Sequence, residues 1–368
     1  MTTRAYLDWN ATAPVRPEAR AAVADALALT GNPSSVHGAG RAARALIEDA
    51  REAVAHMVGA GANQIVFTSG GSEANALALS GGMRVLASSI EHDSVLAHAG
   101  SDRIAVTSDG VVDLDDLDAK LASGRRPALV SVMMANNETG TIQPIADVVR
   151  IARTHGALVH TDAAQAAGRM AVDFLGLGAD LLSISAHKLG GPQGIGALVV
   201  GERASVMPWI KGGGQERGRR AGTENVAGIA GFGAAAIAAP ATDWTSVQSL
   251  RDDLEQRAVG LGAEIFADQA PRLPNTASLR LPGMGAETLV IALDLAGIAV
   301  SAGAACSSGK VRPSPVLTAM GKPAGIASEA IRVSLGWTTT AEEIDLFIAA
   351  LGEIRGRIGR RDLDRAAA

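Results

Sequence analysis

Short apolar runs alternate with helix-like segments between about residue 60 and residue 200. The segment at 144–156 has Pro144 near its start and Gly156 directly after His155, which are the usual signals at the two ends of a helix. The runs between such segments are nearly continuously apolar, as is typical of strands buried on both faces. Candidate strands lie at residues 64–68, 84–88, 128–134, 157–161, 181–185 and 196–200. This alternation predicts an α/β fold with a mostly parallel sheet covered by helices on both faces.

The pattern changes at residues 238–244, where the sequence reads "AAPATDW". A charged helix is expected over 246–262, followed by a smaller unit of strands and helices. A chain of 368 residues is long enough for about two domains. We therefore expect a large domain over residues 14–243 and a small domain formed by 1–13 and 244–368.

Composition excludes several classes of protein. The net charge of −5 comes without a basic face of the size that nucleic acid requires, so direct nucleic-acid binding is not expected. The most membrane-like stretch, residues 226–241, is short and rich in Ala and Gly, which favours a closely packed buried helix over a membrane span. One cysteine allows neither an internal disulfide nor a cysteine-cluster metal site. We expect a soluble, cytoplasmic enzyme.

A dinucleotide-binding pattern occurs at residues 38–43, "GAGRAA". It follows "NPSSVH" where such a site needs a strand, and no acidic residue lies near position 60 to bind a ribose. The pattern therefore does not predict a nucleotide site.

Polar side chains follow the predicted strands at the points where those strands end. In a doubly wound sheet, ligands bind beyond the carboxyl ends of the strands. Taken singly, each side chain has an ordinary structural explanation, such as a helix cap for Asp162 or a surface amine for Lys188. Together they place an anion-binding glycine loop, an imidazole, amides, a carboxylate and an amine at one edge. These residues are Gly71 and Ser72, His92, Asn136, Asn137 and Glu138, Asp162 and Gln165, and His187 and Lys188.

Pyridoxal phosphate uses groups of all these kinds: an amine for its Schiff base, an anion beside its ring nitrogen and a loop for its phosphate. Lys188 is the candidate amine and Asp162 the candidate partner of the ring nitrogen. They are 26 residues apart, which suits two adjacent strand ends joined by one crossover. His92 could lie over the ring and move protons, and Gln165 or Asn137 could bind its hydroxyl oxygen.

Several strings, in order along residues 6–345, resemble the cysteine desulfurases of the NifS/IscS type. The most specific are "SAHKLGGPQG" and "GGGQERGRRAGTEN", accompanied by "NNETGTIQPI" and "HTDAAQAAGR". These enzymes are class V, fold-type I pyridoxal phosphate-dependent transferases. The resemblance implies a large domain whose mostly parallel sheet is covered by helices, a smaller α/β domain, and a homodimer.

The resemblance also implies roles for the residues at the cofactor. Lys188 would bond covalently to it, Asp162 would pair with its ring nitrogen, and His92 would stack on the ring and act as an acid and base. Asn137 and Gln165 would contact the ring oxygen. The phosphate would be held by Gly71, Ser72, Ser185 and His187, with Thr223 reaching it from the other subunit.

Arg332, in "AIRVSLG", would bind the substrate carboxylate, with Asn137 beside it. The planar guanidinium suits this task because it can donate two parallel hydrogen bonds to a carboxylate. Without the resemblance, a structural ion pair is the alternative explanation of Arg332.

Cys306 is the single cysteine and lies in "SAGAACSSGK", residues 301–310. A free cysteine is often a buried, inert residue, but this Gly- and Ser-rich stretch is typical of a surface loop. The resemblance implies that Cys306 is a nucleophile that takes sulfur from L-cysteine as a persulfide and releases L-alanine. His92 or Lys310 is a candidate base for the thiol. The sulfur would pass to an acceptor protein, such as an iron–sulfur scaffold, or towards thio-cofactor or tRNA biosynthesis.

The chain departs from the family pattern by lacking hydroxyl side chains at Ala221, Ala302 and Ala304 and by having Ser307 in place of threonine. It also ends earlier than some members that dock a scaffold protein there. These differences leave the acceptor and the transfer rate open. Selenocysteine lyase or another class V enzyme is the alternative activity, although an aminotransferase would need no cysteine in this loop.

Overall fold

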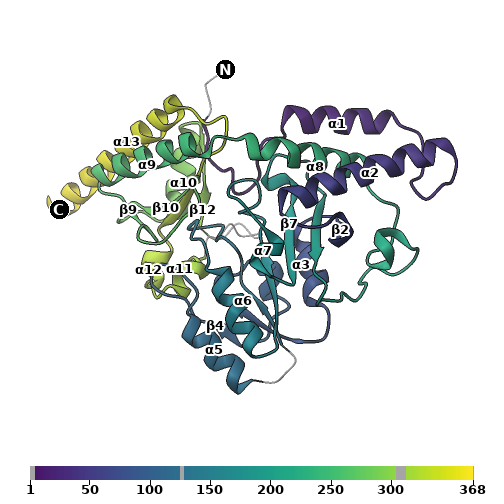
Figure 1. Cartoon of the computed structure of the whole chain (residues 1–368). Coiled ribbons are helices and arrows are strands. Elements are labelled where there is room, and N and C mark those ends of the chain that lie inside the picture. The colour runs from purple at the N-terminus through teal and green to yellow at the C-terminus, as the bar shows by residue number, and fades with distance from the viewer. Residues whose placement is uncertain (1–4, 125–127, 304–311, 368) are drawn as a thin grey trace.

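The largest sheet has seven strands in the order β2-β8-β7-β6-β5-β3-β4 (Figure 1), and the computed structural model describes residues 5–124, 128–303 and 312–367. The pairs of neighbouring strands are parallel except for those formed by β8, which is antiparallel to both β2 and β7. The mostly parallel sheet predicted from the sequence is confirmed. Its strands are β2 (Ile65–Thr68), β3 (Arg84–Ser88), β4 (Arg103–Ile104), β5 (Ala128–Ser131), β6 (Leu158–Asp162), β7 (Leu181–Ser185) and β8 (Gly196–Val200).

All six strands expected in this region are present, but β5 is shorter than the expected 128–134. After Ser131 the chain still pairs with β6, since Val132 N donates to His160 O. On its other side, however, Met133 N donates to the Glu91 carboxylate at 2.6 Å instead of to a strand. The two-residue strand β4 has no apolar run and was not predicted.

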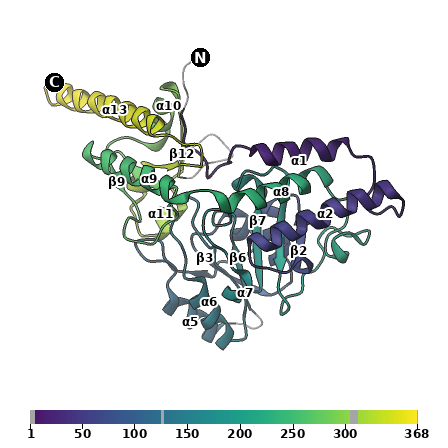
Figure 2. The same cartoon turned by 45° about the horizontal axis from the view of Figure 1, so that its top comes forward.

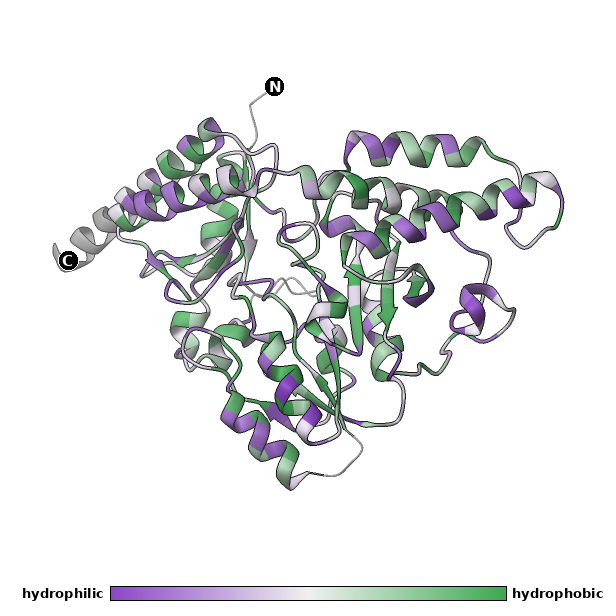
Figure 3. Cartoon of the chain, viewed as in Figure 1, coloured by the Kyte–Doolittle hydropathy of each residue, from purple (hydrophilic) through white to green (hydrophobic). Residues whose placement is uncertain are grey.

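Alternate residues of the central strands point to opposite faces of the sheet, and both faces are buried. Within β7, Leu181 belongs to the apolar cluster on one face and Leu182 to the cluster on the other. Leu198 and Val199 of β8 are divided in the same way. This explains why the strands read as continuous apolar runs, and Figure 3 shows them as hydrophobic ribbons.

Helices cover both faces of this sheet, as predicted. The helix α3 packs against β2, β6, β7 and β8, whereas α6 packs on β6 and α2 on β2. The predicted helix at 144–156 is α6, with Pro144 at its N-cap and Gly156 at φ +69° after its end. The helices of this part are α1 (Pro17–Ala28), α2 (Gly38–Met57), α3 (Gly71–Leu79), α4 (Asp93–Leu96), α5 (Leu114–Ser123), α6 (Ile145–Thr154), α7 (Phe174–Leu177) and α8 (Val226–Ala238).

The apolar helix α8 lies between α1 and α2, as both views show (Figures 1 and 2). Its glycines permit this close packing: a Cβ on Gly233 would lie 2.6 Å from the Cβ of Ala50 on α2, and one on Gly231 would lie 2.6 Å from Val23 on α1. The expected buried helix is confirmed. Among the described residues, no single helix is long and apolar enough to cross a membrane. The helical stretches Val226–Ala241 and Trp244–Gly260, bent by 73°, satisfy the length and composition criteria only as a pair.

A second sheet is built from the C-terminal part of the chain. Its strands are antiparallel and follow the order β12-β13-β10-β9, while β1 near the N-terminus pairs with β11. Its strands and those of the β1–β11 pair are β1 (Ala5–Tyr6), β9 (Glu264–Ile265), β10 (Thr276–Arg280), β11 (Ile298–Ala299), β12 (Ser301–Ala302) and β13 (Ala330–Ser334). The helices here are α9 (Trp244–Gly260), α10 (Ala286–Leu295), α11 (Pro315–Ala319), α12 (Ala324–Ala327) and α13 (Ala341–Ala367).

This second sheet has an apolar core of its own, to which β1, β10, β13, α9, α10 and α13 contribute. The N-terminal residues reach it because β1 pairs with β11 and Ser334 N donates to Leu7 O. The domain boundaries at 13/14 and 243/244 stay predictions; α9 begins at Trp244.

Candidate active site

A cavity of about 730 Å³ opens where β3, β5, β6 and β7 end, between the two sheets. Its volume lies within the range of small-molecule sites. Of the residues predicted for the site, those that line it are Gly71, Ser72, His92, Asn137, Glu138, Asp162, Gln165, Ser185, His187, Lys188 and Arg332. Side chains from distant parts of the chain therefore converge at the predicted edge of the sheet.

Lys188 follows β7 directly, in the short helical turn Ala186–Lys188. Its Nζ donates to the backbone oxygens of Asn10 at 2.6 Å and Ala11 at 2.9 Å. Burial lowers the pKa of the Lys188 amine to about 7, and the positive charges of Arg332 and Arg169 act in the same direction. A large fraction of this amine is therefore neutral, and hence nucleophilic, at neutral pH.

Asp162 is the last residue of β6, the strand adjacent to β7. Its Oδ2 accepts a hydrogen bond of 2.7 Å from Asn75 Nδ2, and its Oδ1 accepts one of 2.9 Å from Ala164 N. The side chain is 8% exposed. Lys188 and Asp162 thus come from neighbouring parallel strands, as their spacing predicted.

His92 caps the N-terminus of α4 through Nδ1, which lies 3.1 Å from Ser94 N and 2.8 Å from Ser94 Oγ. The hydrogen bond from the backbone makes Nδ1 an acceptor. The ring orientation is consequently fixed at the cavity wall, where Nε2 is the nitrogen left to hold or move a proton.

Gly71 opens α3, and its backbone lies close to Ser185 at the end of β7: a Cβ on Gly71 would be 3.3 Å from the Ser185 Cβ. Ser72 follows in the first turn, where backbone N–H groups point out of the helix. His187 Nδ1 lies 3.2 Å from Thr12 Oγ1. Burial, followed by the charges of Lys188 and Arg169, lowers the pKa of His187 to about 4, so it is neutral at neutral pH.

Gln165 donates from Nε2 to Asn10 O at 3.1 Å. Its Oε1 accepts from Arg169, which also donates to the backbone oxygens of Trp9 and Lys188. Arg169 is a buried residue that the sequence did not single out. It ties the N-terminal segment to the chain around Lys188.

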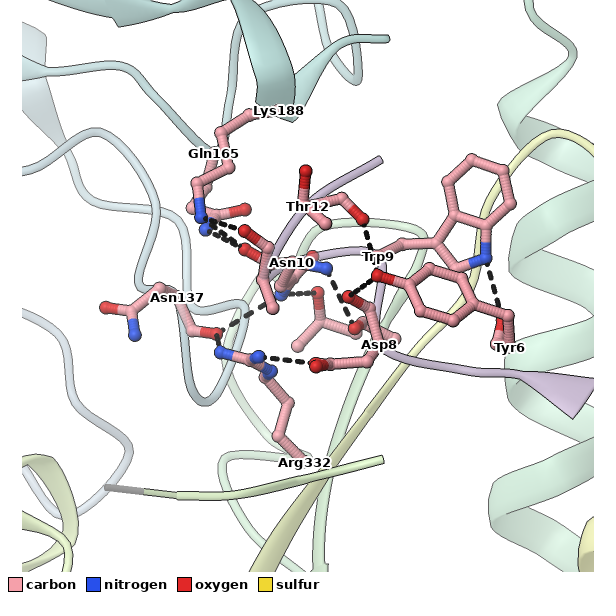
Figure 4. A network of polar contacts seen from close by, with 12 residues as sticks. Tyr6, Asp8, Trp9, Asn10, Thr12, Asn137, Gln165, Lys188 and Arg332 are labelled. Carbon is pink, nitrogen blue, oxygen red and sulfur yellow. Dashed lines mark hydrogen bonds and ion pairs between the residues drawn. The ribbon is translucent and has the colours of Figure 1, made fainter. Parts of the chain in front are cut away.

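Arg332, on β13, reaches the cavity from the second sheet. Its Nη2 donates to Asp8 Oδ1 at 2.7 Å and its Nη1 to Asn137 O at 3.1 Å (Figure 4), while the buried Nε has no hydrogen-bond partner among the described residues. Figure 4 shows the Asn137 amide pointing away from this guanidinium. Arg332 is thus held by a side chain and by a backbone oxygen, both from other elements.

Four predicted residues are not seen in this cavity: Asn136, Thr223, Cys306 and Lys310. Asn136 is buried and donates from Nδ2 to Ile90 O at 3.1 Å, and Lys310 lies outside the described residues. Thr223 lines a separate, smaller cavity with Thr68, Ser69 and Gly194, so its predicted role requires a second subunit and stays a prediction. Cys306 lies outside the described residues. Gly303 and Arg312, which flank residues 304–311 in the chain, both line the main cavity.

Three further acidic and amide residues that line the cavity, Asn75, Glu91 and Glu138, have no predicted role. Glu91, beside His92, is buried and accepts 2.6 Å hydrogen bonds from Ser88 Oγ and Met133 N. Burial raises its pKa to about 8. Asn75 holds Asp162, and its signal in the sequence is a lone amide in the apolar helix "ANALAL". Glu138 is buried as well.

Comparison with known proteins shows the family of the chain. The class V aminotransferase family model matches residues 5–347. The chain is 43% identical to a cysteine desulfurase of Cereibacter sphaeroides, over 95% of each chain, and 39% identical to the cysteine desulfurase IscS of Dictyoglomus turgidum, over 96% of this chain and 95% of that one. The structure of a NifS-like protein from Rickettsia africae matches with a TM-score of 0.89 at 36% identity, over 96% of this chain and 99% of that one. The chain belongs to the class V aminotransferase family, among its cysteine desulfurases of the NifS/IscS type.

Proposed function

We propose that the protein is a cysteine desulfurase that uses pyridoxal 5'-phosphate to convert L-cysteine into L-alanine and a persulfide on Cys306. The observation that carries the proposal is the convergence of a half-buried amine, Lys188, and a buried carboxylate, Asp162, from adjacent strand ends in a cavity that also contains Arg332.

The donor set of the cavity fits the cofactor. Lys188 offers an amine of lowered pKa, and Asp162 offers a carboxylate whose partners are hydrogen-bond donors without charge. The start of α3, with Gly71 and Ser72, offers backbone N–H groups for a phosphate close to Ser185. When bound, the cofactor supplies an electron sink for the substrate's α-carbon.

The remaining roles belong to side chains of the protein. Asp162 stabilises a proton on the ring nitrogen, and Asn75 keeps this carboxylate in place. Arg332 binds the substrate carboxylate with its fork, and His92 holds or moves a proton at Nε2. Asn75, Asp162 and Arg332 are buried, which excludes water and strengthens their electrostatic contacts.

The sulfur step is assigned to Cys306. Its thiolate attacks the substrate sulfur, so a sulfur–sulfur bond forms while the carbon–sulfur bond breaks. The electron pair of the broken bond stays with the carbon fragment, which takes up a proton and leaves as alanine. One thiol and one cysteine thus give one persulfide and one alanine. Thr223 of a second subunit would complete the phosphate site in a homodimer, and the persulfide would pass to an acceptor protein.

The test compares three purified proteins. Wild type should absorb in the visible range with bound cofactor and release alanine from L-cysteine. Lys188→Ala should lose that absorbance band, whereas Cys306→Ala should keep it and form no persulfide. Lys322→Ala, on a half-buried lysine away from the cavity, is the control. Full turnover of L-cysteine by Cys306→Ala would refute the mechanism, and turnover restricted to selenocysteine would establish the alternative activity.

A further inference from the structure

The buried carboxyl group of Glu138 lies next to Gly303 and Ser314, the two ends of the segment 303–314 that carries Cys306. Glu138 belongs to the loop after β5 and is 5% exposed. Its backbone N donates to Asn136 Oδ1 at 2.9 Å, which fixes the start of the side chain. The contacts of its carboxyl group, however, lie on the other side of the cavity, next to the second sheet.

Ser314 is the contact at the C-terminal end of the segment. Its hydroxyl donates to Glu138 Oε2 at 2.5 Å, and the same Oγ accepts from Leu317 N at 3.0 Å as the N-cap of α11. Ser314 is 1% exposed, so water does not compete for this hydrogen bond. Glu138 is therefore joined to the first turn of the helix that follows the segment.

Gly303 is the contact at the N-terminal end of the segment. A Cβ built on Gly303 would lie only 2.9 Å from Glu138 Oε2 and 3.3 Å from the Ser314 Cβ, so the backbone passes directly against the carboxylate. Gly303 N donates to Ala330 O on β13 and Ser314 N donates to Ala327 O, which fastens both ends to the second sheet and α12. Ser314 is thus joined to Glu138 Oε2 by a hydrogen bond, and Gly303 lies close to the same oxygen.

An ordinary explanation of Glu138 is a buried acid that only stabilises the contact between the two sheets. Two features favour more than that. The first is that Oε2 accepts from Ser314 and lies close to Gly303, on either side of residues 304–311 in the chain. The second is that Glu138 lines the cavity together with Arg332. Burial raises the pKa of Glu138 to about 7, and the Ser314 hydrogen bond and Arg332 oppose this shift.

We propose that Glu138 is a positioning residue for sulfur transfer: by binding Ser314 and packing against Gly303 at the cavity wall, it sets the approach of Cys306 to the substrate. The inference rests on the proposed role of Cys306 as the sulfur acceptor. It assigns no chemical step to Glu138.

The first measurement is the rate of Cys306 alkylation by iodoacetamide in the cofactor-loaded enzyme. Because Cys306 is the single cysteine, the label reports one site. Glu138→Ala and Ser314→Ala should each raise the rate about tenfold, as expected from loss of a buried hydrogen bond to an acid. Ser328→Ala is the matched control, since its exposed hydroxyl bonds only locally, to Gly325 O.

The second measurement separates substrate binding from transfer. In a single turnover followed by mass spectrometry, Glu138→Ala should slow persulfide formation about tenfold and leave the half-saturating concentration of L-cysteine within about twofold of wild type. Glu138→Gln keeps an oxygen that can accept from Ser314, so it should restore most of the transfer rate. The double variant Glu138→Ala/Ser314→Ala should lose no more than the worse single variant, because both changes remove one contact.

The outcomes are distinct. The inference would be overturned by unchanged transfer and alkylation rates in both alanine variants. It would also be overturned if only the half-saturating concentration of L-cysteine rose, or if Glu138→Gln did not restore the transfer rate. If Glu138→Ala does not fold, Ser314→Ala and Glu138→Gln carry the same comparison. Absence of a persulfide in wild type would instead refute the proposed function, and the alkylation rates, which need no turnover, would still decide whether Glu138 holds the segment.

Discussion

Arg332 Nη2 lies 2.7 Å from Asp8 Oδ1, although the two residues are 324 positions apart in the chain. The ion pair is mostly buried, with side-chain exposures of 6% and 18%. Asp8 therefore fixes the orientation of the guanidinium that is proposed to bind the substrate carboxylate.

Replacing Asp8 should weaken substrate binding more than catalysis. In Asp8→Ala the guanidinium loses its charged partner, and the half-saturating concentration of L-cysteine should rise about tenfold, as for a lost hydrogen bond to a charged group. Steady-state kinetics measures this. Asp345→Ala is the control, because Asp345 forms an exposed ion pair with Arg257. Tighter binding in Asp8→Ala would show that Asp8 competes with the substrate instead of positioning Arg332.

Asn75 should control cofactor affinity through Asp162. The variant Asn75→Ala removes the 2.7 Å hydrogen bond to Asp162 Oδ2, and we expect the cofactor to bind about tenfold more weakly. Asn75→Asp should be worse, because it places a second carboxylate against the first. Titration of cofactor-free protein by absorbance gives both values, with the exposed Asn63→Ala as control. An unchanged cofactor affinity in Asn75→Asp would contradict the role of this hydrogen bond in cofactor binding.

Capture of the cofactor by the cofactor-free protein should depend on pH with a midpoint near 7. The pKa of Lys188 is lowered to about 7, so the amine is protonated below that pH and reactive above it. The rate of reaction with pyridoxal phosphate should therefore rise as the pH increases from 6 to 8 and then level off. The charge of Arg332 contributes to the low pKa, so Arg332→Ala should move the midpoint to higher pH. A rate that still rises steeply above pH 9 would show that Lys188 has the pKa of an ordinary lysine.

The buried pair of Arg51 and Glu216 should be important for stability. Arg51 Nη1 and Nη2 donate to the two Glu216 oxygens at 2.7 and 2.9 Å, and Phe67 N donates to Glu216 Oε2 at 2.9 Å. Removing one partner leaves a buried charge, which costs about 3 kcal/mol or more. Arg51→Ala should lower the free energy of unfolding by that amount in a denaturant titration.

The exposed pair of Arg150 and Asp147 provides the control, and Arg150→Ala should change stability little. The chain at Glu216 and Arg217 adopts φ values of +47° and +56°, which the pair with Arg51 helps to hold. A loss in Arg51→Ala no larger than that in Arg150→Ala would contradict this.

The sequence predicted the sheet and the meeting of Lys188 with Asp162 because both depend on local patterns. Buried parallel strands read as apolar runs, and residues after their carboxyl ends must share one edge. The contact of Glu91 could not be predicted in this way. Its carboxyl group takes the place of a neighbouring strand beside Met133, and nothing in an apolar run tells where a side chain will replace backbone pairing.

Contacts across the cavity could not be predicted from the sequence either. The backbone oxygens of Asn10 and Ala11 that bind Lys188 carry no side-chain signal, since every residue has the same carbonyl group. The string "NNETG" drew attention to Glu138 but not to its contact with Ser314, because that contact depends on how the two sheets are placed. Such pairings follow from tertiary packing alone.

The stretch around β1 has a consequence for how the enzyme matures. Residues near position 10 supply the acceptors for Lys188 and the anchor for Arg332, yet β1 pairs with β11 at Ile298–Ala299, near the other end of the chain. On the ribosome this stretch emerges early, whereas its partner strand β11 is synthesised almost 300 residues later. The backbone oxygens that bind Lys188 therefore reach their final position only after Ile298–Ala299 have been synthesised, late in translation.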